Sequence, residues 1–168
     1  MIMGLGKWFG GLFGGGDLTR DWVEDPSREL HVDLDTPSLG GVAVGQPFSN
    51  LSWLGPADSG SGTYDFHKKG LTVGEREGDV GMLAMEFHHD NGFEPFQGSC
   101  SAKGKPLTLS PAMTPEELIE QLGEPAYREV ESKDTCKLLT LGYQLGDEFA
   151  FNFHTDADGQ HRLYAVFG

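Results

Sequence analysis

The stretch from Thr114 to Pro125 carries the signals that begin and end a short helix, and it constrains the fold more than any other part of the chain. The Thr114 hydroxyl can cap the helix, and Glu117 can reach back to the cap and complete a capping box. Pro115 suits the first helical position, where its missing N–H costs nothing. Gly123 suits the residue that ends a helix, and Pro125 prevents continuation. The sequence therefore predicts a helix of about two turns here.

The apolar side of this helix needs a surface to cover. Leu118, Ile119 and Leu122 fall on one stripe. In the segment 148–154, aromatic residues that include Phe151 and Phe153 alternate with other residues, as in a strand with one apolar face. We therefore expect the three aliphatic side chains to be buried against these aromatic residues or their strand neighbours.

A second stretch, from Gln46 to Pro56, follows the same order, with proline at its start and Leu-Gly-Pro at its end. Segments with strand-like alternation follow each stretch. They are 63–66, 70–73 and 81–88 in the first half, and 137–143, 148–154 and 162–167 in the second. The sequence thus predicts an α+β fold: two tandem helix-plus-antiparallel-meander repeats that form a sheet packed on one side by short helices.

The predicted organisation has four parts. Residues 1–16 are a glycine-rich amphipathic segment, and residues 17–41 are an acidic linker that leads into a first strand. Residues 42–98 are the first α+β repeat and residues 99–168 the second. The cysteines of the second repeat, Cys100 and Cys136, are expected to be reduced thiols, since two cysteines do not make a disulfide scaffold.

A short helix that ends in Leu-Gly-x-Pro and precedes an aromatic-rich meander resembles the BLIP-like superfamily, which includes the β-lactamase inhibitor protein and the SmpA/OmlA outer-membrane lipoproteins. The matching residues are Thr114, Glu117, Leu122, Gly123, Pro125, Tyr143, Phe151, Phe153 and Gly159, and in the first copy Pro47, Leu54, Gly55, Pro56, Phe66 and Phe87. The resemblance implies a protein that acts by binding another protein rather than by catalysis. It departs from the tandem inhibitor because Cys100 and Cys136 do not reproduce an intra-repeat pair.

The charge of the chain bears on its partners. It has 12 basic and 26 acidic residues, a net charge of −14. Such a field repels polyanions, so we expect no nucleic-acid partner and no electrostatic attraction to an anionic membrane.

The first 16 residues are the exception in composition. Leu5, Trp8, Phe9, Leu12 and Phe13 recur at helical spacing among glycines, a candidate contact with a membrane or a partner. The segment is too short to span a bilayer and lacks the features of a signal peptide. It is either an interfacial anchor, a frayed tail, or a segment that packs on its own domain or on a second subunit. We expect a cytoplasmic protein, or alternatively one associated with the cytoplasmic side of a membrane.

Histidines are the main candidates for metal chemistry. His88 and His89 with Asp90, and His154 with Asp156, come at matching points of the two predicted copies. Neither the HExxH helix nor the paired CxxC hooks of zinc sites occur, so polar strand ends explain these residues better than a metal site. We expect no cofactor and assign no catalytic residue.

The sequence thus favours a non-enzymatic protein-binding or assembly module whose partner is an unidentified protein. A peripheral membrane protein anchored by residues 1–16 is one alternative. A metal-binding or enzymatic domain that uses the histidines is the other.

Overall fold

The structure is a computed structural model, and it describes residues 16–168 of the chain. The predicted contact residues Leu5, Trp8, Phe9, Leu12 and Phe13 lie outside the described residues.

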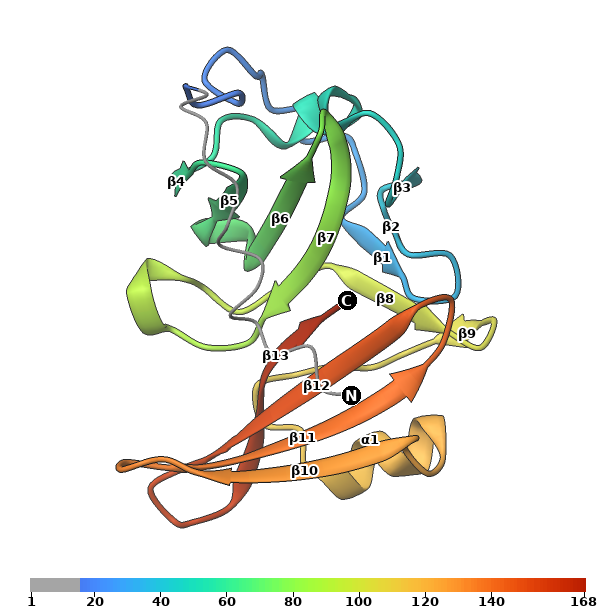
Figure 1. Cartoon of the computed structure of the whole chain (residues 1–168), viewed down its shortest axis with the longest axis vertical. Helices are drawn as coiled ribbons and strands as arrows, with labels where there is room; N and C mark the ends of the chain where they lie inside the picture. The colour runs from blue at the N-terminus through green and yellow to red at the C-terminus, as the bar shows by residue number, and fades with distance from the viewer. Residues whose placement is uncertain (1–15) are drawn as a thin grey trace.

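Eight strands form one large, twisted antiparallel sheet (Figure 1). From one edge to the other these are β10 (Tyr127–Ser132), β11 (Lys137–Gln144), β12 (Glu148–Thr155), β13 (His161–Phe167), β7 (Asp79–Glu86), β6 (Leu71–Arg76), β5 (Thr63–Phe66) and β4 (Ser59–Gly60). The pairing of β13 with β7 joins two four-strand meanders, one from each half of the chain. The strands predicted over 63–66, 137–143, 148–154 and 162–167 are confirmed to within a residue at either end.

A second, small sheet has five short strands. In spatial order these are β3 (Val42–Ala43), β2 (Ser38–Leu39), β1 (His31–Asp33), β8 (Ser99–Ala102) and β9 (Lys105–Pro106). The pairs are antiparallel except β1 with β8, which is parallel and joins segments far apart in the chain. The small sheet contains residues from three of the predicted parts of the chain. β1 and β2 come from the linker, β3 from the first repeat, and β8 and β9 from the second repeat.

The predicted helix forms as α1 (Pro115–Leu122) with a complete capping box. The Thr114 hydroxyl accepts from the Glu117 N–H at 3.3 Å, and the Glu117 carboxylate accepts from the Thr114 N–H at 2.8 Å. At the other end, the Tyr143 hydroxyl donates to the Gly123 carbonyl at 2.9 Å. The Lys103 ammonium donates to the Leu122 carbonyl, which places a positive charge at the negative end of the helix.

The second predicted helix is instead a 3₁₀ helix, η2 (Phe48–Leu54), and no side chain caps it. Three of its four buried residues, Phe48, Leu51 and Leu54, recur every third residue, which matches three residues per turn; the fourth is Trp53. Two further 3₁₀ turns are η3 (His67–Lys69) and η4 (Asp90–Gly92). No helix in the described part of the chain is long and apolar enough to cross a membrane.

The α+β prediction, with two helix-plus-meander repeats, is wrong. Strands hold 41% and helices 14% of the described residues, so the fold is β-rich. The physical reason is twofold. The Gln46–Pro56 stretch, which contains Ser49, Asn50 and Ser52, offers the backbone side-chain partners that compete with an α-helix. In addition, short segments that lack a clear hydrophobic periodicity pair with one another and form the small sheet.

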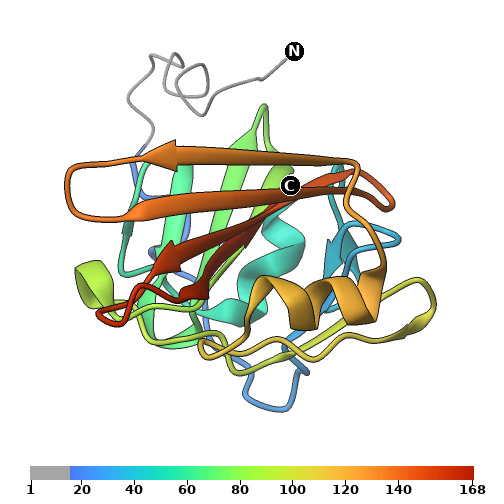
Figure 2. The same cartoon turned by 90° about the horizontal axis from the view of Figure 1, so that it is seen from below.

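One hydrophobic core lies under one face of the large sheet, and α1 and η2 lie on that side (Figure 2). The small sheet contributes Val32 and Leu39 to the same core. Leu118 and Leu122 are buried, as are the aromatic residues of β12, while Ile119 is partly buried against the cluster. The predicted burial of the helix stripe is thus confirmed for the two leucines.

The opposite face of the large sheet, here called the outer face, has its own apolar side chains. Along β7, Leu83 and Met85 enter the core, while Met82, Ala84 and Glu86 point the other way. Four buried hydrophobic residues do not belong to the core cluster; they are Ala84, Phe93, Leu138 and Ala165. The sheet therefore has apolar side chains on both faces.

Replacing Leu118 with alanine should lower the free energy of unfolding by about 2–5 kcal/mol, since the side chain is fully buried. Chemical denaturation measures this. Glu120→Ala, on the exposed side of the same helix, is the control and should change stability by less than about 0.5 kcal/mol. Equal effects of the two changes would contradict the packing of α1 on the core.

Candidate functional site

Five aromatic and imidazole rings form a continuous line beside the outer face, which we call the ring row. From one end to the other they are His67 of η3, Phe93 after η4, His88 after β7, Tyr164 of β13 and His154 of β12. Residues far apart in the chain thus meet at one place. The pairing of β7 with β13 and of β13 with β12 brings His88, Tyr164 and His154 together.

The two ends of the ring row have different geometry. The ring of Tyr164 lies between two imidazoles, stacked on His154 at 3.7 Å and 3° and on His88 at 4.0 Å and 13°. Phe93 meets its two histidines edge-on, His88 at 5.5 Å and His67 at 4.7 Å. Each internal ring therefore has a neighbour on both sides, which restricts its rotation.

A β-bulge places Tyr164 in the row. Asn152 pairs with Ala165 and the next residue, Phe153, pairs with Leu163, so Tyr164 is the extra residue without a direct partner on β12. A bulge re-aims a side chain and bends its strand. The Tyr164 carbonyl accepts from the Phe87 N–H on β7's side at 2.8 Å, which fixes the bulge at the join between the two meanders.

Hydrogen bonds define the tautomer of His88. Its Nδ1 accepts from the backbone N–H of Asp90 at 3.0 Å, so Nε2 carries the proton and donates to Glu86 at 2.8 Å. A second proton on His88 would break the bond at Nδ1. Both ring nitrogens are thus in use, one ring face stacks on Tyr164, and the side chain is only 10% exposed.

Tyr164 is held at its hydroxyl as well as its ring. The hydroxyl donates to the Asp90 carboxylate at 2.8 Å. Burial raises the pKa of Tyr164 well above its ordinary value, and the bond to the Asp90 carboxylate adds to the shift. Asp90 therefore anchors two members of the ring row, Tyr164 through its carboxylate and His88 through its backbone.

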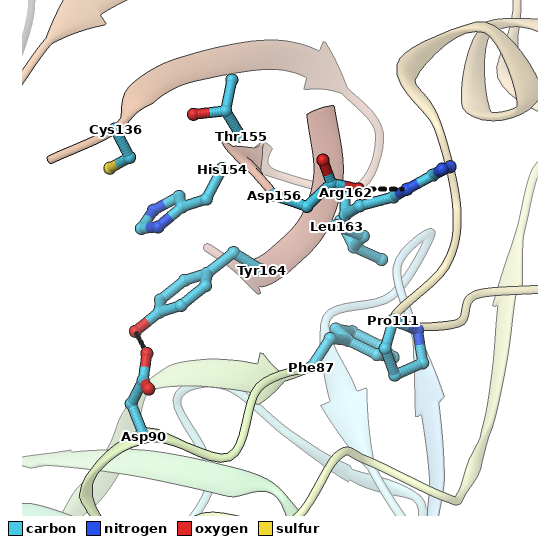
Figure 3. A pocket seen from close by; sticks show the side chains of 10 residues that line it. All are labelled: Phe87, Asp90, Pro111, Cys136, His154, Thr155, Asp156, Arg162, Leu163 and Tyr164. Carbon is cyan, nitrogen blue, oxygen red and sulfur yellow. Dashed lines mark hydrogen bonds and ion pairs between the residues drawn. The ribbon is translucent and has the colours of Figure 1, made fainter. Parts of the chain in front are cut away.

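His154 ends the row beside a hollow of about 300 Å³ (Figure 3). The hollow is also lined by Tyr164, Cys136 and Arg162, and Arg162 bonds to Asp156 at 3.2 Å. Burial lowers the pKa of His154, and the positive charge of Lys133 lowers it further. His154 is therefore a neutral imidazole at neutral pH.

The structure brings together two of the three predicted histidine candidates. His88 and His154 lie on opposite sides of Tyr164, whereas His89 is exposed in the loop that follows β7. Within residues 16–168, no group of three or more His, Cys, Asp and Glu side chains is placed to hold a metal ion. His88 and His154 instead stack on the two sides of the Tyr164 ring.

Sequence reasoning did not identify His67, Phe93 and Tyr164 as parts of a site. Tyr164 stands next to Ala165 in a run that reads as one alternating strand, and nothing local signals the bulge. His67 and Phe93 belong to turns, whose positions depend on tertiary pairing. The matching Phe-His pairs at 87–88 and 153–154 were the available signal.

Outside the ring row, the small sheet also contains a histidine with side-chain partners, His31. The Nδ1 of His31 is 2.7 Å from the Ser99 hydroxyl, and its Nε2 is 3.0 Å from the Ser101 hydroxyl. The parallel register of β1 and β8 places both serines beside the ring. Between them Cys100 points into the core, where burial raises the pKa of its thiol to about 12. These bonds tie the two strands together.

Comparison of the chain with protein-family models, with curated proteins and with solved structures gave no match. The resemblance to the BLIP-like superfamily stays a prediction.

The pKa of His154 predicts a pH dependence of stability. The unfolded chain binds a proton at this residue near pH 6.5, while the folded chain resists it, so protonation favours unfolding. The stability contribution of neutral His154 is complete above about pH 6.5 and is lost as the pH falls toward the folded-state pKa. Wild-type protein should therefore lose more unfolding free energy between pH 7.5 and 5.5 than His154→Phe, which keeps a ring on Tyr164.

Denaturation curves of both proteins at these pH values measure the difference. His154→Gln is the second variant, since it also lacks the titrating group but loses the stacked ring. It should match His154→Phe in pH dependence and be less stable at both pH values. A wild-type pH dependence equal to that of both variants would contradict the assignment.

Proposed function

We propose that this chain is a non-enzymatic protein-binding module and that the outer face of the large sheet, centred on the ring row, is its binding surface. The observation that carries the proposal is the placement of the ring row. Tyr164, His88 and His154 lie on the side of the sheet opposite the core cluster, so the core does not require them. Aromatic residues gathered away from a core are typical of protein interfaces.

The composition of the outer face supports the same proposal. Ala84 and Ala165 are buried along the join of β7 and β13, and the larger Met82 and Phe167 beside them are only partly buried. The exposed parts of Met82 and Phe167 offer apolar surface to a partner.

The order of the ring row also favours binding. The Asp90 and Glu86 hydrogen bonds hold Tyr164 and His88 in place before any partner arrives. A surface that is already ordered loses little side-chain entropy on association, roughly 0.5–1.5 kcal/mol less for each side chain so fixed. The same bonds engage both His88 nitrogens and the Tyr164 hydroxyl, which supports a binding role over proton transfer at these groups.

Site-specific photo-crosslinking in cells that make the protein tests this proposal. Benzoylphenylalanine at Phe167 and at Met82 should give the same protein adduct, identified by mass spectrometry. The same probe at Glu116, exposed on α1 on the core side of the sheet, should not give it. Tyr164→Ala should reduce the adduct yield about fivefold or more, since truncation of a central aromatic anchor costs about 1 kcal/mol or more.

Circular dichroism of each variant verifies that the fold is kept. Adducts obtained equally from Glu116, or none from Phe167 and Met82, would contradict a binding role for the outer face.

A further inference from the structure

The edge strand β10 is the most exposed long strand of the described chain. It pairs with β11 along one side only, and it ends the large sheet (Figure 1). Five of its six residues are exposed. At the other edge of the sheet, β4 has two residues. A six-residue strand is about 20 Å long, and alternate residues turn their N–H and C=O groups away from the existing partner.

Apolar side chains accompany this open backbone. Val130 is 64% exposed and Tyr127 is 37% exposed, two of the four large hydrophobic residues that are exposed among residues 16–168. Exposed apolar residues on an unpaired edge mark a site that can accept a further strand.

The two sides of β10 differ in charge. Tyr127, Glu129 and Glu131 share the outer side, because Tyr127 lies over Gly142, whose neighbour Leu141 enters the core. Arg128, Val130 and Ser132 share the other side, and Arg128 is already paired with Glu124 at 2.8 Å. The outer side of the edge is therefore acidic.

Glu148 of β12, two strands in from the edge, influences the Tyr127 hydroxyl. Burial raises the pKa of the Tyr127 hydroxyl, and the carboxylates of Glu148 and Glu129 raise it further. On the edge strand itself, the outer side carries two carboxylates, those of Glu129 and Glu131.

A second copy of the chain does not suit this edge. A two-fold axis that joins two sheets edge to edge stands perpendicular to them, so each residue faces one on the same side of the sheet. Only two such antiparallel registers pair five of the six β10 residues. One sets Glu129 opposite its own counterpart, and the other sets Glu129 opposite Glu131 twice. Like charges directly opposite are destabilising, and the net charge of −14 opposes self-association further.

We propose that β10 accepts an extended, basic segment of another protein as a ninth strand of the sheet. Lysine or arginine residues at alternate positions of that segment lie opposite Glu129 and Glu131, and the residue between them is apolar and covers Val130. The recognition pattern is basic–apolar–basic, with main-chain hydrogen bonds along the edge. This proposal rests on the edge alone and is independent of the role of the outer face.

A fluorescein-labelled peptide of the sequence Thr-Thr-Lys-Val-Lys-Val-Lys-Thr-Thr is the probe, and fluorescence anisotropy with the full chain measures its binding. The double variant Glu129→Lys/Glu131→Lys should bind it about tenfold more weakly or worse, because two attractive pairs become repulsive. The same variant should gain affinity for the peptide with glutamate in place of lysine. That gain cannot come from a protein that fails to fold.

The matched control is Glu116→Lys/Glu120→Lys on α1, which makes the same change in net charge at two exposed positions. It should bind the basic peptide as the wild type does. Equal weakening by both double variants would show attraction to the net charge only and would overturn the proposal.

Amide hydrogen exchange distinguishes strand addition from contact by side chains alone. Saturating peptide should protect outward amides within 127–132 and leave the amides of β4 unchanged. Protection elsewhere, or none on β10, would overturn the proposal. So would a concentration-dependent dimer of the free chain whose β10 amides are already protected.

Discussion

The pairing of β7 with β13 is the interaction on which the rest of the structure depends. The N–H and C=O groups of Leu83 and Gly168 bond to each other at 3.2 Å, and Met85 lies opposite Val166. These contacts turn two separate four-strand meanders into one sheet wide enough to cover α1, η2 and the small sheet. They also set the end of β7 beside the Tyr164 bulge, so the ring row exists only because this join does.

Local signals in the sequence were sufficient for part of this fold. The capping box of Thr114 and Glu117, with Pro115 and Gly123, predicted α1 because each signal acts within one turn of chain. The sequence did not show that Phe48 to Leu54 would wind as a 3₁₀ helix, because proline at a helix start suits both helix types. Nor did it predict β10, whose apolar residues are exposed and so leave no pattern of burial.

The candidate site was predicted only in its histidines. His88 and His154 recur at the same point of two alternating segments, which makes them candidates for one site, and the structure places them on opposite sides of Tyr164. Their hydrogen-bond partners depend on a bulge and a turn, which follow from register rather than from residue type. The carboxylates of Glu129 and Glu131 lie on a different surface, the edge strand β10.

The pairing of β7 with β13 also affects how the chain folds while it is being synthesised. Strands β4 to β7 emerge from the ribosome well before β13, so β7 waits with one side unpaired while the following segments are made. β1 waits in the same way for β8, its parallel neighbour. Pairings between such distant segments close large loops, which makes folding slow and leaves partly made chains prone to wrong associations. A growing chain of this protein therefore exposes the unpaired edges of β1 and β7 until β8 and β13 have been made.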